Sequence, residues 1–239
     1  MRIYKFGGAS VKDANGVKNL ITILNTLGSE KTLIVVSAMG KTTNSLELVV
    51  KNYFDNKEEL QYSINEVFTF HNKILNDLFN DNKHKIFSDV KEILENLRIF
   101  LKRNKSPDYS FVYDQVVIFG EILSTKIINS YLIHSNIRCN WLDARTLIKT
   151  DSKYRDANLN WEITKNSISN GVNTKLLNIT QGFIASDSNN FSTTLGREGS
   201  DYTAAIFAYC LNAESVTIWK DVPGVLNADP RVFKKPQLL

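Results

Sequence analysis

Cysteine and histidine are scarce in this sequence of 239 residues, which has two cysteines and three histidines. Cys139 and Cys210 lie far apart, and they have neither the spacing of metal ligands nor a cluster of histidines near them. This pattern is typical of buried thiols in a reducing compartment and does not favour a disulfide framework or a zinc site. We therefore predict no metal site built from protein side chains.

Targeting signals are also missing. The N-terminus runs directly into residues 2–8, Arg-Ile-Tyr-Lys-Phe-Gly-Gly, without the apolar core of a signal peptide, and we find no apolar run of membrane-spanning length. The formal net charge of +4 comes from Lys and Arg spread along the chain among acidic residues, so no basic patch predicts nucleic-acid binding. We expect a cytoplasmic protein with neither a membrane nor a nucleic acid as its partner.

What is present is enough apolar sequence, 43%, to bury the core of one α/β domain. Thr32–Val36 is a continuous apolar run, which suits a central strand buried on both faces. Residues 58–103 have helical periodicity throughout and predict a helical hairpin inserted between strands. The expected strands are 3–6, 32–36, 137–142, 176–183 and 216–219, with a further extended piece at 147–150. Helical segments alternate with these strands, and this predicts a mostly parallel sheet with helices on both faces.

A glycine-containing loop at residues 193–201, Thr-Thr-Leu-Gly-Arg-Glu-Gly-Ser-Asp, joins a strand to a helix that we expect to begin near Tyr202. Gly196 and Gly199 allow a tight turn whose N–H groups can face an anion at the positive end of the helix. Arg197 adds a planar, bidentate donor for a carboxylate or phosphate. Asp201 can cap the helix or hold a cation. On these residues alone, an ordinary loop with an N-cap is an equal alternative.

Lys5 stands at the end of the first strand, before Gly7 and Gly8, where parallel sheets usually bind ligands. A solvated edge lysine is the alternative. A second small-residue loop runs from Ser37 to Asn44 and contains Thr43. Its Gly-Lys-Thr triplet at 40–42 is not a P-loop, because that motif needs a glycine at position 35, which is valine.

Glu121 lies inside an apolar helical segment, where a buried carboxylate would need a partner, although a place on the helix surface is equally compatible with the pattern. The last strand is followed by Lys220, Asp221 and Arg231. The whole set offers cations and backbone donors but few general bases and no catalytic triad. This composition suits phosphoryl transfer to an acceptor that is already ionised.

Three ordered motifs resemble the signatures of the aspartate kinases in the amino-acid kinase superfamily. Residues 5–11, Lys-Phe-Gly-Gly-Ala-Ser-Val, are similar to the opening signature, with Ala9 in place of threonine. Residues 181–184 with 194–204 resemble the second signature almost throughout, and residues 219–225 with 228–231 resemble the third. The motifs span the whole chain, so the match is specific.

The resemblance implies a three-layer αβα sandwich that uses ATP and Mg²⁺ to phosphorylate the side-chain carboxylate of L-aspartate, giving 4-phospho-L-aspartate on the route to lysine, threonine and methionine. It implies that Lys5 and the Gly7 and Gly8 amides face the transferred phosphoryl group, and that Asp201 orients the cations around it. The nucleotide side would be formed by Lys220, Asp221 and Arg231.

For the substrate, the resemblance implies that Arg197 binds the α-carboxylate and Glu121 the α-amino group, with Ser37 and Thr43 nearby. The resemblance is weakest for the residues that would contact adenine, because the sequence departs from the family pattern at two positions there. Lys220 stands where many relatives have threonine, and Leu226 where many have tyrosine.

The resemblance further implies that residues 1–239 form a catalytic domain that lacks its last part and the regulatory domains. From this we expect weak nucleotide binding, little activity alone, uncovered apolar surface on strand 216–219, and self-association into a homo-oligomer. A catalytically silent module of the same fold, binding an amino acid or a nucleotide, is the alternative.

Overall fold

The computed structural model describes residues 1–220, 224, 226–228 and 232–238. Its main sheet has five strands, all parallel, in the spatial order β3-β4-β2-β1-β7. The strands are β1 (Arg2–Phe6), β2 (Thr32–Val36), β3 (Asn140–Leu142), β4 (Asn178–Gln181) and β7 (Ser215–Trp219). All five residues of β2 are buried, which confirms the predicted central strand.

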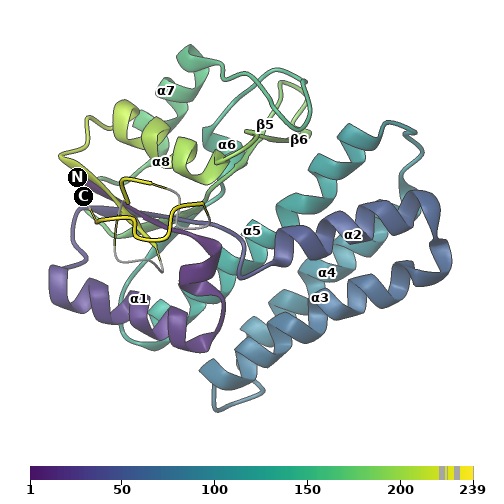
Figure 1. Ribbon diagram of the computed structural model, residues 1–239, viewed down its shortest axis with the longest axis horizontal. Coiled ribbons are helices and arrows are strands. Elements are labelled where there is room, and N and C mark those ends of the chain that lie inside the picture. The colour runs from purple at the N-terminus through teal and green to yellow at the C-terminus, as the bar shows by residue number, and fades with distance from the viewer. Residues whose placement is uncertain (221–223, 225, 229–231, 239) are drawn as a thin grey trace.

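Helices cover both faces of this sheet, as Figure 1 shows, and the three-layer architecture is confirmed. On one face, Ile34 and Val36 pack with α1 (Ala14–Leu27) and α5 (Tyr109–His134). On the other face, Leu33 and Val35 pack with α7 (Trp161–Gly171) and α8 (Gly199–Cys210). Alternate side chains of a strand point to opposite faces, so a strand between two helical layers is apolar throughout.

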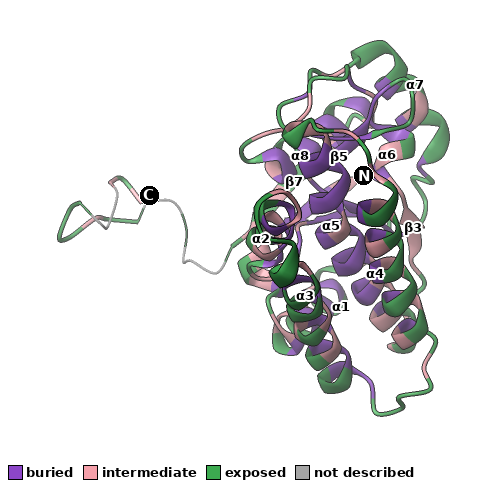
Figure 2. Ribbon diagram, turned by 90° about the vertical axis from the view of Figure 1, so that its right-hand side faces the viewer, coloured by how far each residue is buried: buried purple, intermediate pink, exposed green. Residues whose placement is uncertain are grey.

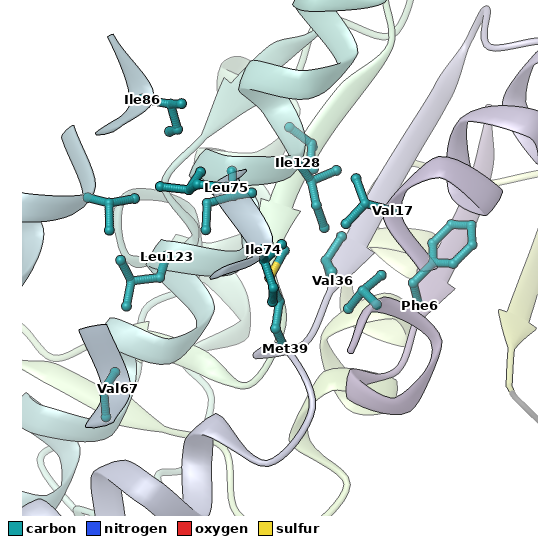
Figure 3. Close-up of a cluster of buried hydrophobic side chains, with 14 of the residues drawn as sticks. Phe6, Val17, Val36, Met39, Val67, Ile74, Leu75, Ile86, Leu123 and Ile128 are labelled. Carbon is teal, nitrogen blue, oxygen red and sulfur yellow. The ribbon is translucent and has the colours of Figure 1, made fainter. Parts of the chain in front are cut away.

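The predicted helical hairpin is part of a four-helix bundle beside the sheet, at the right of Figure 1. It consists of α2 (Thr42–Asp55), α3 (Lys57–Leu78), α4 (Ile86–Arg103) and α5. Figure 3 shows the cluster that joins the two parts, in which Met39, Ile74 and Leu123 belong to the same core as Phe6 and Val36. The bundle is therefore fixed to the sheet by apolar packing.

Helix α5 requires a correction to the sequence analysis. It has 26 residues, and an 18-residue window within it has a mean hydropathy of 1.5, so its length and composition pass the test for a membrane-spanning helix. The fold buries 67% of that apolar window, and Figure 2 shows α5 buried among the other helices. A helix surrounded by protein on most sides is apolar on most of its surface, so the high hydropathy of α5 is that of a core helix.

A small antiparallel hairpin, β5 (Ile184–Ser186) and β6 (Ser192–Thr194), precedes α8. Its turn is closed by the Asn190 N–H, which donates to the Asp187 carbonyl at 3.1 Å. Asp13 accepts from the Gly16 N–H at 2.9 Å and caps α1.

Several boundaries differ from the predictions. The strand at 137–142 begins only at Asn140, and the strand at 176–183 is confined to β4. The extended piece at 147–150 is wrong at its start, because the short helix α6 (Ala144–Leu147) includes Leu147. Asp143 causes this difference, since its side chain accepts from the Arg145 N–H at 3.1 Å and caps the helix.

Strand β7 lies at an edge of the sheet, with β1 as its neighbour. Val216 and Ile218, on the face opposite α1, are 45% and 44% exposed. The expectation of uncovered apolar surface on this strand is confirmed for the described residues.

Candidate functional site

The carboxyl ends of β1, β2, β4 and β7 meet at one edge of the sheet, and backbone hydrogen bonds join the segments that follow β1, β2 and β4. The Ser37 N–H donates to the Phe6 carbonyl at 3.1 Å, and the Gly40 N–H donates to the Gly8 carbonyl at 3.0 Å. The Gly182 N–H donates to the Val36 carbonyl at 2.9 Å. This is the edge at which open parallel sheets bind ligands.

A cavity of about 220 Å³ opens there. It contains five of the predicted site residues, drawn from β1, α5, α8 and the loop and helix after β2: Lys5, Ser37, Thr43, Glu121 and Asp201. Its lining also includes Gly196 and Gly199, the glycines of the predicted anion loop. Sequence reasoning assigned no role to the other three lining residues, Phe183, Glu198 and Ser200. The tertiary structure therefore collects residues from opposite ends of the chain at one place.

Lys5 and Asp201 form an ion pair, with Nζ 2.7 Å from Oδ1. Lys5 is only 6% exposed, so the solvated edge lysine is excluded. The expected helix start near Tyr202 is wrong, because α8 begins at Gly199. Asp201 consequently lies in the first turn and does not cap the helix; its carboxylate holds Lys5 instead. Lys220 approaches the same carboxylate, with Nζ 3.9 Å from Oδ2.

Glu121 is 2% exposed, which excludes a place on the helix surface. Its Oε1 accepts from the Ala38 N–H at 3.4 Å, and its Oε2 has no hydrogen-bond partner among the described residues. Burial raises the pKa of this carboxyl to about 8, because removal from water penalises the charged form. A buried carboxylate with a free oxygen on a cavity is suited to a cationic ligand.

The other wall of the cavity is the turn that leads into α8. Gly196 has φ of 73° and Glu198 has φ of 56°, both in the left-handed region. This conformation is easy for glycine and costs a residue with a Cβ about 1 kcal/mol or more. The turn brings the N-terminus of α8 to the cavity, and helix N-termini favour anions.

The remaining predicted residues lie around this cavity. Arg197 is exposed, and it stands between two cavity-lining residues, with no ion pair to the part of the chain that the structure describes. Gly7 and Gly8 form the turn after β1. Asp221 and Arg231 lie outside the described residues.

Position 8 must be glycine because the backbone of the next loop lies too close to leave room for a Cβ. This gives a prediction for stability. A Cβ on Gly8 would lie 2.6 Å from the Ala38 carbonyl oxygen, whereas a Cβ on Gly7 would meet only the Lys5 Nζ, at 3.4 Å. We expect Gly8→Ala to lower the free energy of unfolding by about 1–3 kcal/mol, as overpacking does. Gly7, with φ of −72°, is the matched control, and Gly7→Ala should be neutral or slightly stabilising. Urea denaturation measures both; equal stability of the two variants would contradict the prediction.

Among the described residues, no group of three or more His, Cys, Asp or Glu side chains is placed to hold a metal ion. Mg²⁺ usually keeps several waters and takes phosphate oxygens as ligands, with one or two carboxylates. The cavity can supply such a carboxylate from Asp201, so the residues are compatible with an ion that enters together with a nucleotide.

The fold and the cavity define an α/β protein whose cavity lies at the carboxyl ends of parallel strands and presents side chains of both charge signs. The model of the amino acid kinase family matches residues 1–239, and the chain belongs to that family.

Known relatives agree with this assignment. The chain is 30% identical over 242 residues to lysine-sensitive aspartokinase 3 of Escherichia coli (strain K12), a match that covers 96% of this chain and 51% of that protein. It is 29% identical over 246 residues to the chloroplastic bifunctional aspartokinase/homoserine dehydrogenase 2 of Arabidopsis thaliana, covering 99% of this chain and 26% of that protein.

Among solved structures, E. coli aspartokinase III in complex with aspartate and ADP (R-state) superposes with a TM-score of 0.90 at 29% identity, covering 100% of this chain and 53% of that one. The resemblance to aspartate kinases and the predicted fold are therefore confirmed. The chain spans about half the length of the E. coli protein and about a quarter of the bifunctional one.

Proposed function

We propose that the protein is a kinase that transfers the γ-phosphoryl group of ATP to the side-chain carboxylate of L-aspartate, forming 4-phospho-L-aspartate and ADP. The observation that carries the proposal is Glu121, a buried carboxylate with an unpartnered oxygen on a cavity that also contains a buried lysine. Such a cavity suits a ligand with an ammonium group at one end and a reacting anion at the other. Aspartate is such a molecule, and the E. coli relative has been crystallised with aspartate and ADP.

On the substrate side, Glu121 binds the α-ammonium group and Arg197 binds the α-carboxylate. Ser37 and Thr43, which line the cavity, contribute hydroxyl groups between these charges. The two fixed charges of an α-amino acid then have opposite partners, and the β-carboxylate is left to point at the phosphoryl group.

In the reaction, an oxygen of the β-carboxylate attacks the γ-phosphorus, and the bond from this phosphorus to the β,γ-bridging oxygen breaks. The acceptor is already ionised, so no general base is needed. Lys5, the Gly7 and Gly8 amides and the N-terminus of α8 stabilise the charge that spreads over the phosphoryl oxygens. Asp201 holds the Lys5 ammonium in place through the 2.7 Å ion pair.

On the nucleotide side, Lys220 stands at the end of β7, near Asp201, and Asp221 and Arg231 are assigned to the same role from the sequence motif alone. Mg²⁺, bound with the phosphates, supplies charge neutralisation. We also propose a cytoplasmic homo-oligomer that begins the route to lysine, threonine and methionine. The exposed Val216 and Ile218 support self-association, and light scattering of the purified protein tests it.

Arg197 gives a prediction for the affinity of the protein for its two ligands. We expect Arg197→Lys to weaken aspartate binding by about 1.5–3 kcal/mol, roughly ten- to a hundredfold, because a lysine cannot reproduce a bidentate contact with a carboxylate. The affinity for ATP should stay within about twofold, since the guanidinium faces the amino acid. Calorimetry with each ligand measures both. Unchanged affinity for aspartate would show that Arg197 is not the carboxylate clamp.

A panel of acceptors tests the function as a whole. ADP release is measured with L-aspartate, L-glutamate, N-acetyl-L-glutamate and carbamate, on these 239 residues and on the longest natural form of the protein. We expect ADP release with L-aspartate and with none of the other three acceptors. Binding of aspartate or ATP without release in either form would instead indicate a catalytically silent module, and release with another acceptor would overturn the assignment of the substrate.

A further inference from the structure

A second buried carboxylate, Asp114, lies on α5 seven residues before Glu121, and it is fully buried. Its Oδ1 accepts from the Thr194 hydroxyl at 2.8 Å. Its Oδ2 accepts from the Thr194 N–H at 2.9 Å and from the Arg155 N–H at 3.0 Å. One side chain thus joins α5, the end of β6 and the loop at residue 155.

These contacts lie directly before the cavity. Thr194 is the last residue of β6, and the next five residues, Leu195–Gly199, include three that line the cavity. The loop at 155–156 packs on the same turn, since a Cβ on Gly196 would lie 2.6 Å from the Asp156 Oδ1. The Ala157 N–H also donates to the Thr194 carbonyl, at 3.0 Å.

Helix α5 therefore carries one wall of the cavity and holds the other. Seven residues are about two helical turns, so Asp114 and Glu121 lie on the same face. Gln115 strengthens the connection: it accepts from the Ser192 N–H at 3.1 Å and donates to the Ser192 carbonyl at 2.7 Å. The hairpin that ends at Thr194 is fixed to α5 by these two side chains.

Three donors point at the Asp114 carboxyl, and this arrangement suits the ionised form, which only accepts hydrogen bonds. The pKa of this carboxyl is raised to about 6, because the effect of burial exceeds the opposing effect of the hydrogen bonds from Arg155 and Thr194. A buried charge is costly unless it is fully hydrogen-bonded, and such fully bonded groups fix one arrangement of the segments that they join.

We propose that Asp114 is a positioning residue, which fixes the loop Leu195–Gly199, including Arg197, relative to Glu121. The distance between Arg197, which binds the α-carboxylate, and Glu121, which binds the α-ammonium group, is then set by the single helix α5. This inference rests on the proposed function, because it is the amino acid substrate that must meet both clamps at once.

Asp114→Asn tests the proposal, since it keeps the shape but replaces one accepting oxygen by an NH₂ group that faces N–H and O–H donors. We expect KM for aspartate to rise at least tenfold and KM for ATP to change less than twofold. Amide hydrogen exchange should accelerate in residues 192–199 and 155–158 and stay unchanged in β1 and β2. Asp108→Asn is the matched control on the same helix: Asp108 is the exposed N-cap of α5, and asparagine caps equally well.

Unchanged exchange in 192–199 would overturn the proposal, and so would faster exchange there with an unchanged KM for aspartate. If Asp114→Asn does not fold, Thr194→Val removes only the 2.8 Å hydroxyl contact and should produce the same pattern with smaller changes. If the unmodified protein uses no aspartate, the proposed function fails by itself. The exchange measurement then decides alone whether Asp114 holds the loop.

Discussion

Glu121→Gln should weaken aspartate binding at pH 8.5 by a hundredfold or more. The amide has the same shape but no charge, so the substrate's ammonium group would be buried without a counter-charge. Removing one partner of a buried ion pair typically costs about 3–5 kcal/mol. Calorimetric titration with aspartate measures the effect. Glu92→Gln, an exposed glutamate on α4, is the control and should bind aspartate as the unmodified protein does.

The same carboxyl predicts a pH dependence. Its pKa in the free protein is about 8, so it is mostly protonated at pH 7 and must lose its proton to pair with an ammonium group. We expect the affinity for aspartate to rise about tenfold per pH unit between pH 6 and 8 and then to level off. Glu121→Gln should show no such slope over this range. A flat profile for the unmodified protein would contradict the assigned role.

The same titration affects folding stability in the opposite direction: aspartate affinity rises with pH, whereas the stability contributed by Glu121 falls. The pKa of this carboxyl is about 4.5 in the unfolded chain and about 8 in the fold, so between these values the folded state holds one more proton. The contribution of Glu121 to stability is therefore present below pH 4.5 and is lost as the pH rises through 8. We expect Glu121→Gln to raise Tm above pH 8 while it removes binding. Equal melting temperatures at pH 9 would show that the ionised side chain carries no such cost.

Lys5→Ala should lower kcat by about 10²–10³, the loss typical of removing one preorganised electrostatic contact to a transition state. The buried ammonium points into the cavity from the end of β1, and its position is fixed by Asp201. The affinity for ATP should fall much less, because the glycine turn and the N-terminus of α8 hold the phosphates in the ground state. ADP release gives kcat, and calorimetry gives the ATP affinity.

A double variant separates the two residues of the ion pair. Lys5→Ala leaves the Asp201 carboxylate unpaired beside the phosphates, and this adds repulsion to the loss of the lysine. If Asp201 acts through Lys5, the variant Lys5→Ala/Asp201→Ala should be no slower than Lys5→Ala alone. ATP affinity that falls in step with turnover would show that Lys5 is a binding residue only.

The sequence by itself determined the local elements and the residues available for chemistry. The unbroken apolar run at residues 32–36 indicated a strand buried on both faces, as β2 is. Asp13, before an apolar helical pattern, is a residue type that favours the start of a helix, and it caps α1. The glycine-containing loops at the strand ends could be predicted from the sequence, because glycine readily adopts the tight-turn conformations that residues with a Cβ avoid. Alternating strands and helices then fixed a parallel sheet, and parallel strands place their carboxyl ends at one edge.

The tertiary structure alone decided how these residues act. Glu198 adopts a left-handed conformation that glycine would favour, so α8 begins at Gly199, three residues earlier than its apolar pattern predicted, and Asp201 faces Lys5 instead of capping. The local pattern left Glu121 equally compatible with burial and with the helix surface, and nothing local marks Asp114 as bonded to Thr194. Burial and long-range hydrogen bonds depend on which segments meet, and sequence periodicity reports only the residues within one element.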